Sequence, residues 1–259
     1  MPKLAANITM MFNEVDFLDR FAAAANAGFK GVEYLFPYDY DKNELKQKLA
    51  ENNLTQVLHN LPAGNWANGE RGIACHSDRT AEFEASVDKA IDYATALGCK
   101  QVNCLAGIRQ SNRDPSDARE TFIRNLQFAA PRFKAAGIKL LIEAINTRDI
   151  PGFFLCNTQQ AVDIIKAVGS DNLFVQYDIY HMQIMEGDLA PTIEKNLKLI
   201  PHMQLADTPG RHEPGTGEIN YDFLLPHIDK LGYQGWIGCE YKPAGKTVEG
   251  LGWMEKFKS

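Results

Sequence analysis

The feature that most constrains the fold of this chain is a repeated unit, in which a short apolar run is followed by a segment with helical periodicity. Eight such units follow one another along the 259 residues. The apolar runs span residues 4–8, 31–35, 54–58, 101–105, 139–143, 173–178, 202–205 and 236–240. The first helical segment carries an apolar stripe at Phe17, Leu18, Phe21 and Ala25, and the others span residues 42–52, 80–97, 117–136, 158–168, 189–200, 221–231 and 248–257.

Strands that alternate with helices predict an α/β fold with a parallel sheet. Eight units in roughly 250 residues are what a (β/α)8 TIM barrel requires, and a doubly wound open sheet is the alternative. The open sheet would favour a G-x-G-x-x-G or G-x-x-x-x-G-K-[ST] turn after an early strand, and the chain has neither motif. No linker divides the sequence. We therefore expect a single TIM-barrel domain over residues 1–259 and no nucleotide cofactor.

Composition and charge narrow the class of partner. The chain is 45% hydrophobic and 23% charged, as in ordinary globular proteins, and its 27 Lys and Arg against 33 Asp and Glu give a net charge of −6. This balance argues against a nucleic-acid partner. The first residues lack a secretory signal, and no apolar stretch approaches the roughly 18 to 20 residues of a membrane span. The five cysteines are scattered and form no C-x-x-C pair, which argues against a disulfide framework or a zinc knuckle. We expect a cytoplasmic protein without a membrane partner.

Polar side chains end the last four apolar runs: Glu143, Asp178, Gln204 and Glu240. The carboxyl ends of barrel strands converge at one mouth, so these side chains should meet there. Three carboxylates in one mouth repel one another unless a cation lies between them. An all-oxygen donor set suits Mg²⁺ or Mn²⁺ better than zinc. For each single acid, the alternative role is to cap the helix that follows.

Two histidines are expected near the same mouth. His181 lies three residues after Asp178, and as a neutral hydrogen-bond donor beside the metal it would polarise a substrate oxygen; a surface loop is the alternative. His59 directly follows the third apolar run and is a further candidate for substrate contact. His202 alternates with Gln204 on one strand face, so we expect it to pack inside the barrel rather than bind a ligand.

Five segments together resemble the bacterial hydroxypyruvate isomerase family: LHNLPAG at 58–64, GERGIAC at 69–75, YDIYHMQ at 177–183, EPGTGEINY at 213–221 and GCEYKP at 238–243. That family belongs to the xylose-isomerase-like barrels, alongside ketose 3-epimerases. The resemblance implies that Glu143 and Glu240 form the proton-transfer pair and that Glu143, Asp178, Gln204 and Glu240 match the metal site. It also implies that His181 faces the substrate and that Arg211 matches the arginine after the seventh strand.

The implied activity is an isomerase that interconverts hydroxypyruvate and 2-hydroxy-3-oxopropanoate through an enediolate. Residues 1–12 look more like the 2-oxo-tetronate isomerase branch, so that activity, or a ketose 3-epimerase, is the alternative. A metal-dependent phosphodiesterase similar to endonuclease IV is disfavoured, because its site is rich in histidine and this chain has six in all. A barrel that binds a sugar acid without turnover is a third hypothesis.

An acidic substrate would need more positive charge than one divalent cation supplies, so a basic side chain should reach into the mouth from a loop. Arg71 is the first candidate, because it lies between glycines in the long loop after the third apolar run. Lys242 and Arg211 are the competing candidates. The alternative for Arg71 is an exposed salt bridge with Glu70 or Asp78.

Overall fold

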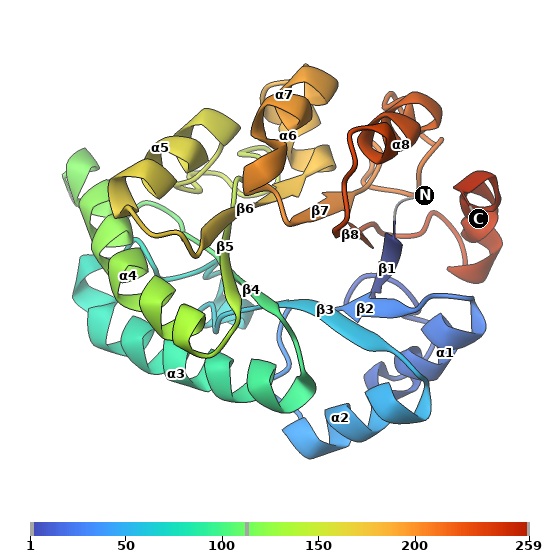
Figure 1. Cartoon of the computed structure of the whole chain (residues 1–259), viewed down its shortest axis with the longest axis horizontal. Coiled ribbons are helices and arrows are strands. Elements are labelled where there is room, and N and C mark those ends of the chain that lie inside the picture. The colour runs from blue at the N-terminus through green and yellow to red at the C-terminus, as the bar shows by residue number, and fades with distance from the viewer. Residues whose placement is uncertain (1–2, 112–113, 258–259) are drawn as a thin grey trace.

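The computed structural model describes residues 3–111 and 114–257, and its strands form a closed parallel barrel (Figure 1). Each strand pairs with the next one along the chain, and β8 pairs with β1 to close the ring. The strands are β1 (Lys3–Asn7), β2 (Gly31–Glu33), β3 (Thr55–Asn60), β4 (Gln101–Cys104), β5 (Lys139–Glu143), β6 (Leu173–Asp178), β7 (His202–Leu205) and β8 (Trp236–Cys239). The predicted TIM-barrel architecture is confirmed; the predicted domain bounds, residues 1 and 259, lie outside the described residues.

Helices surround the barrel and connect its strands, with α3 and α4 side by side (Figure 1). The α-helices are α1 (Arg20–Asn26), α2 (Lys42–Glu51), α3 (Thr80–Leu97), α4 (Pro115–Ala135), α5 (Thr158–Val168), α6 (Ile179–Met185), α7 (Leu189–Asn196) and α8 (Tyr221–Lys230). The 3-10 segments are η1 (Phe17–Asp19), η2 (Trp66–Asn68), η3 (Ser77–Arg79), η4 (Leu197–Leu199) and η5 (Val248–Phe257). Within the described ranges, no helix has both the length and the hydrophobicity of a membrane span.

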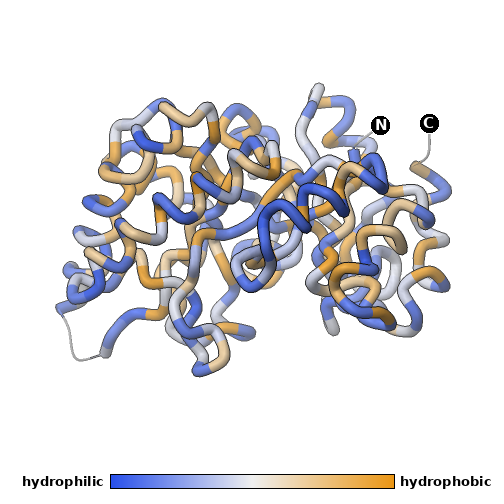
Figure 2. The backbone as a smooth tube through the Cα atoms, turned by 90° about the horizontal axis from the view of Figure 1, so that it is seen from below, coloured by the Kyte–Doolittle hydropathy of each residue, from blue (hydrophilic) through white to orange (hydrophobic). Residues whose placement is uncertain are grey.

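Local sequence explains where several helices begin. Asp41, Asn157 and Asn220 each accept hydrogen bonds from backbone N–H groups in the first turn of α2, α5 and α8, respectively. Hydrophilic and hydrophobic stretches alternate along the outer helices, as expected where one face packs on the barrel (Figure 2).

Two elements differ from the sequence-based expectation. The structure has an additional helix, α6, directly after β6, because Asp178 caps its first turn while ending the strand. The last helical segment is the 3-10 segment η5 rather than an α-helix.

The inside of the barrel changes character from one end to the other. Toward the amino ends of the strands it is filled by a small apolar cluster of Ala5, Val57, Leu58 and Leu141. The apolar core proper lies between the strands and the surrounding helices. Nearer the carboxyl ends, the interior is lined by buried polar side chains.

Glu33 is at the centre of this polar layer and is fully buried. Its carboxylate accepts hydrogen bonds from Gln204 Nε2 at 2.7 Å and Asn7 Nδ2 at 2.9 Å, and it pairs with His202 Nε2 at 2.7 Å. A Cβ atom on Gly238 would lie 2.3 Å from the Glu33 carboxylate oxygens, so only glycine fits at that position of β8. His202 thus packs inside the barrel, as the strand alternation predicts.

Candidate active site

A cavity of about 580 Å³ opens at the carboxyl ends of the strands. Its acidic lining comes from Glu143, Asp149 and Glu240. Four basic side chains also line it: Arg71, Arg148, Arg211 and Lys242. The cavity therefore combines buried carboxylates with a ring of cations, an arrangement suited to a small anionic ligand.

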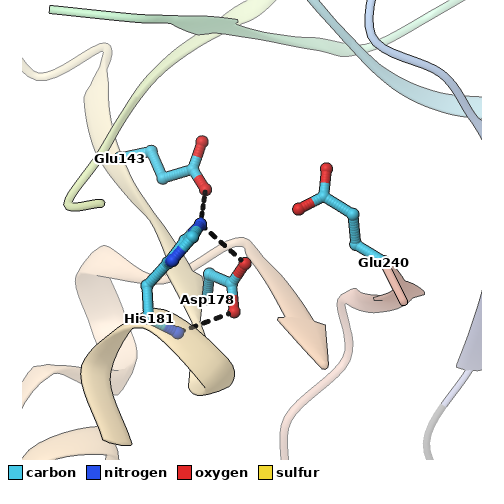
Figure 3. Close-up of side chains that lie close together, drawn as sticks. All are labelled: Glu143, Asp178, His181 and Glu240. Atoms are coloured by element: carbon cyan, nitrogen blue, oxygen red, sulfur yellow. Dashed lines mark hydrogen bonds and ion pairs between the residues drawn. The ribbon is translucent and has the colours of Figure 1, made fainter. Parts of the chain in front are cut away.

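Four buried side chains meet in this part of the barrel: Glu143, Asp178, His181 and Glu240 (Figure 3). One ligand atom from each lies within 4.8 Å of the others. His181 lies beside Glu143 and Asp178, and Glu240 faces them across the site (Figure 3). Glu143 and Asp178 end β5 and β6, and Glu240 directly follows β8, so the convergence of strand ends brings together residues as far apart as 143 and 240 in the sequence.

Asp178 combines the two roles that the sequence left open. Its Oδ1 accepts hydrogen bonds from the backbone N–H groups of Tyr180 at 2.8 Å and His181 at 3.2 Å, which caps α6. Its Oδ2 lies 3.5 Å from His181 Nε2. The cap therefore fixes the carboxylate and, through α6, places His181 beside it.

Asn146 determines the protonation state of His181. The Asn146 Oδ1 accepts the backbone N–H of Asp149, so its Nδ2 is the atom that lies 2.7 Å from His181 Nδ1. An amide N–H can only donate, so Nδ1 is the acceptor and the proton is on Nε2. Burial lowers the pKa of His181 to about 4. His181 is therefore a neutral donor whose Nε2–H faces Asp178 and Glu143, and this tautomer does not bind a metal through Nε2.

The glutamates have perturbed acidities. Burial raises the pKa of Glu143 well above its ordinary value, and the charges of Glu240 and Asp178 add to the effect. Burial likewise raises the pKa of Glu240 to about 8, although Arg211 opposes the shift. Burial therefore favours the protonated form of both carboxyls, whereas a bound cation would favour the charged form.

Arg211 is the basic side chain nearest to these carboxylates. Its Nη2 pairs with Glu240 Oε2 and lies 3.6 Å from Asp178 Oδ2. Its Cζ lies 5.0 Å from the centre of the Tyr180 ring. Burial opposes the charged form, but Glu240, Asp178 and Glu143 outweigh burial and raise the pKa of Arg211. This side chain stays charged and neutralises part of the acidic cluster.

The donor chemistry of the cluster fits a divalent cation, because three buried carboxylates share too little positive charge to be ionised together. Glu143, Asp178 and Glu240 are the candidate oxygen ligands. Gln204 is placed differently: its Nε2 donates to Glu33 at 2.7 Å and its Oε1 accepts from Gln176 at 2.6 Å. Both polar atoms of Gln204 are thus engaged within the interior polar layer.

The loop that carries Arg71 forms one wall of the cavity. The Arg71 guanidinium stacks on Trp66, with Cζ 4.1 Å from the ring centre, and Nη1 donates to the backbone carbonyls of Trp66 and Glu70. The Glu70 carboxylate pairs with Arg79 instead. Within residues 3–111 and 114–257, the remaining nitrogens of Arg71 are thus available to a ligand. Lys242 also lines the cavity, and its backbone N–H and C=O bond to Arg211 and His212.

The expectation that His59 contacts substrate is corrected by the structure. His59 is fully buried, its Nδ1 lies 3.0 Å from Gln56 Nε2, and its ring packs edge-on against Tyr38 at 6.0 Å. Burial lowers the pKa of this imidazole to about 3. Its neighbour Asn60 lines the cavity, and because strand side chains alternate, His59 faces the other way.

Several residues of the site were not expected from the sequence, and four of them bear directly on its chemistry. Asn146 and Arg148 lie in the loop after β5, which carries no periodic signal. Asn7 and Asn103 donate hydrogen bonds to the site glutamates, and both end or nearly end a strand. Inspection of strand ends for neutral polar residues, and not only for acids, would have found these two asparagines.

Comparison with known proteins agrees with this fold. A family model described as xylose isomerase-like TIM barrel matches residues 21–257. The chain is 52% identical to a hydroxypyruvate isomerase from Escherichia coli strain K12, with 100% of both chains covered, and 48% identical to a 2-oxo-tetronate isomerase from Cupriavidus necator, with 99% of both covered. A crystal structure described as an AP endonuclease of family 2 from Brucella melitensis matches with a TM-score of 0.97 and 48% identity over 100% of both chains.

Proposed function

This chain belongs to the xylose isomerase-like TIM barrel family, and from that premise we propose that it is an isomerase that interconverts hydroxypyruvate and 2-hydroxy-3-oxopropanoate. The observation that carries the proposal is the pair of buried glutamates, Glu143 and Glu240, which face one cavity together with a neutral histidine donor and four basic side chains. The relative from Escherichia coli that bears the name hydroxypyruvate isomerase supports this substrate.

The reaction moves one proton between neighbouring carbons and one between the oxygens that they carry. A proton leaves the hydroxymethyl carbon of hydroxypyruvate, and the electron pair forms an enediolate. The hydroxyl proton of that carbon passes to the former carbonyl oxygen, and a proton returns to the former carbonyl carbon as the aldehyde forms. Glu143 and Glu240 are the groups that take up and return this proton, and their raised pKa values bring them nearer to neutral pH, where proton transfer is most efficient.

The negative charge of the enediolate needs donors in place before it forms. His181 supplies one, because its Nε2–H points into the acidic cluster and Asn146 prevents the proton from moving to Nδ1. Glu143, Asp178 and Glu240 would hold a divalent cation, and Mg²⁺ or Mn²⁺ suits these oxygen donors. Gln204, which the sequence predicted as the further ligand, is hydrogen-bonded to Glu33 and Gln176 instead. Such an ion supplies Lewis-acid stabilisation of the two adjacent oxygens.

The substrate carboxylate requires a cation of its own. Arg71 is our first choice, since part of its guanidinium is free and Trp66 fixes its plane. Arg211 and Lys242 are on the opposite loops and would contact the substrate's hydroxyl and carbonyl oxygens or its carboxylate. A bidentate guanidinium–carboxylate contact gives an acid substrate an advantage over a neutral ketose.

A four-carbon substrate is the second candidate, because relatives at 44–48% identity carry the name 2-oxo-tetronate isomerase. Phosphodiester hydrolysis is less favoured, since among the described residues the acidic cluster includes a single histidine.

The test is to incubate the purified protein, supplied with Mg²⁺, with hydroxypyruvate and with 2-oxo-tetronate, and to follow each product by proton nuclear magnetic resonance. We expect turnover of hydroxypyruvate with the higher kcat/KM. A higher kcat/KM for 2-oxo-tetronate would make the four-carbon acid the substrate. Binding of both acids without product would mean that the protein binds these acids and does not catalyse the isomerisation.

A further inference from the structure

Each of the two site glutamates receives an amide hydrogen bond from an asparagine on the neighbouring strand. Asn103 on β4 donates from Nδ2 to Glu143 Oε2 at 2.8 Å, and Asn7 on β1 donates from Nδ2 to Glu240 Oε1 at 3.2 Å. Both asparagines are buried, with exposures of 0% and 1%. The two contacts are equivalent in the barrel, because β4 neighbours β5 and β1 neighbours β8.

The other oxygen of each glutamate has a different environment. Glu143 Oε1 lies 3.9 Å from His181 Nε2, and Glu240 Oε2 pairs with Arg211, and both of these partners line the cavity. One oxygen of each carboxylate is therefore held from the barrel interior, and the other faces the reaction site.

The asparagines are themselves held in place. Asn7 Oδ1 accepts the backbone N–H of Thr9 at 3.1 Å, so its Nδ2 must point toward the carboxylates, where it also donates to Glu33 at 2.9 Å. Asn103 Nδ2 makes its second hydrogen bond to Asn60 Oδ1 at 3.1 Å. In each case one nitrogen joins a glutamate to a second buried acceptor, so rotation of the amide would break two hydrogen bonds.

We propose that Asn7 and Asn103 are positioning residues that set the orientation of the two proton-transfer carboxylates. This inference rests on the proposed function of the glutamates. A carboxylate with one oxygen anchored cannot rotate about its terminal bond, so the second oxygen keeps one direction toward the substrate carbon. Reacting groups that are misplaced by about 1 Å lose on the order of 100-fold in rate, so orientation of this kind is worth measuring.

The two positions differ in what lies behind the asparagine. Asn103 donates to Glu143 and to the neutral side-chain amide of Asn60, whereas Asn7 donates to two carboxylates, those of Glu240 and Glu33. Without Asn7, these two acids face each other with no donor between them, and Glu240 should turn away from the interior. We therefore expect the larger effect at Asn7.

Asn7→Leu and Asn103→Leu remove the donors and keep the branched shape of the side chain. Asn172→Leu is the matched control, because Asn172 Nδ2 also makes two hydrogen bonds, to the carbonyls of Ala130 and Ile138 beside the start of β5, far from the cavity. If a leucine variant does not fold, Asn7→Ser or Asn103→Ser replaces it, since serine is polar but too short to reach the glutamate.

We expect Asn7→Leu and Asn103→Leu to lower kcat for hydroxypyruvate by about 10- to 100-fold with KM changed by less than about threefold, because the substrate-binding cations are untouched. The control should lose stability to urea but keep kcat within about twofold. Site variants whose kcat matches that of the control would overturn the proposal.

Crystal structures of the variants decide the question without turnover. We expect the Glu240 carboxylate to be rotated or split between conformers in Asn7→Leu only, and the Glu143 carboxylate in Asn103→Leu only. Unchanged carboxylates would overturn the positioning role. A wild-type protein that does not convert hydroxypyruvate would refute the proposed function, whereas rotated carboxylates would still support the positioning role.

Discussion

At the level of single residues, three buried carboxylates share their part of the site with one guanidinium, that of Arg211. Arg211 contacts Glu240 and Asp178, whereas Glu143 accepts a hydrogen bond from the neutral amide of Asn103 at 2.8 Å. The pKa of Glu143 is raised by burial and by the charges of Glu240 and Asp178. The protein alone therefore favours the protonated form of its glutamates, and cation binding must release protons.

The raised pKa of Glu240 predicts how stability depends on pH. The pKa of Glu240 is ordinarily 4.5 and is about 8 in the folded protein. The stability that the protonated form contributes is therefore fully present below pH 4.5 and is lost as the pH rises through 8. His181, lowered from 6.5 to about 4, acts in the opposite direction but only below pH 6.5. Between pH 6.5 and 8 we expect Glu240 alone to lower the free energy of unfolding by about 1 kcal/mol per pH unit, and the raised pKa of Glu143 acts in the same direction.

Urea unfolding with a chelator present measures this slope in the wild type and in Glu240→Gln. The variant has no titrating group at that position, so its slope should be smaller. Equal slopes would mean that Glu240 is ionised in the folded protein at neutral pH.

Arg71→Met tests the carboxylate contact. Truncation of a guanidinium paired with a buried carboxylate costs on the order of 2 to 5 kcal/mol, so kcat/KM for hydroxypyruvate should fall by at least about 30-fold. A neutral ketose such as dihydroxyacetone serves as the comparison substrate and should lose much less. Equal losses of kcat/KM on both substrates would mean that Arg71 stabilises the loop around Trp66 and does not bind the substrate carboxylate.

At the level of elements, the loop between β7 and α8 is held by a single buried carboxylate. Asp207 accepts backbone N–H groups from Thr208, Gly215, Gly217 and Ile219 at 2.9–3.1 Å. This loop carries Arg211, whose backbone is in the left-handed region with φ of 58°. Asp207 thus fixes the segment that places the guanidinium.

Asp207→Asn keeps the shape of the side chain but replaces one oxygen by an amide group that cannot accept. Two of the backbone N–H groups then lose their acceptor, at a cost of about 1 to 3 kcal/mol. We expect the amides of Gly215, Gly217 or Ile219 to exchange with solvent about 10-fold faster or more, with no change in α3. Unchanged exchange in this loop would contradict the role given to Asp207.

The elements themselves were largely predictable, because apolar runs and helical stripes are local properties. The predicted strands at 139–143, 173–178 and 202–205 have the observed bounds, and Glu240 lies one residue beyond β8. The helix α6 was not predictable in the same way. This helix has seven residues, and its first four are all buried, so no amphipathic stripe marks it. Its N-cap, Asp178, is also the last residue of β6, so no separate capping residue marks its start.

At the level of the whole molecule, the barrel interior joins residues that are distant in the sequence. Glu33 contacts His202, 169 positions away, and Asn7 contacts Glu240, 233 positions away. Strand alternation predicted that His202 and Gln204 point inward, but it contains no information on their partners. The acids of the site were found because they end strands, whereas Asn7 and Glu33 matter through contacts that need the closed barrel, to Glu240 and to His202.

His202→Leu tests the contribution of this interior to stability. The substitution leaves the Glu33 carboxylate buried with the amide donors of Asn7 and Gln204 alone. Leaving a buried acceptor without one of its hydrogen-bond partners costs about 1 to 3 kcal/mol, so the urea midpoint should drop. A variant with wild-type stability would contradict the contribution of the His202–Glu33 contact to stability.

The most direct test of the account is the rate at which Glu143→Gln and Glu240→Gln convert hydroxypyruvate to 2-hydroxy-3-oxopropanoate, followed by proton nuclear magnetic resonance beside the wild type. Glutamine keeps the shape of each side chain and removes the proton acceptor. Because general-base catalysis contributes about 100- to 10,000-fold, we predict an active wild type and losses in that range for both variants. Near-wild-type turnover by either variant, or a wild type that forms no product, would contradict the account.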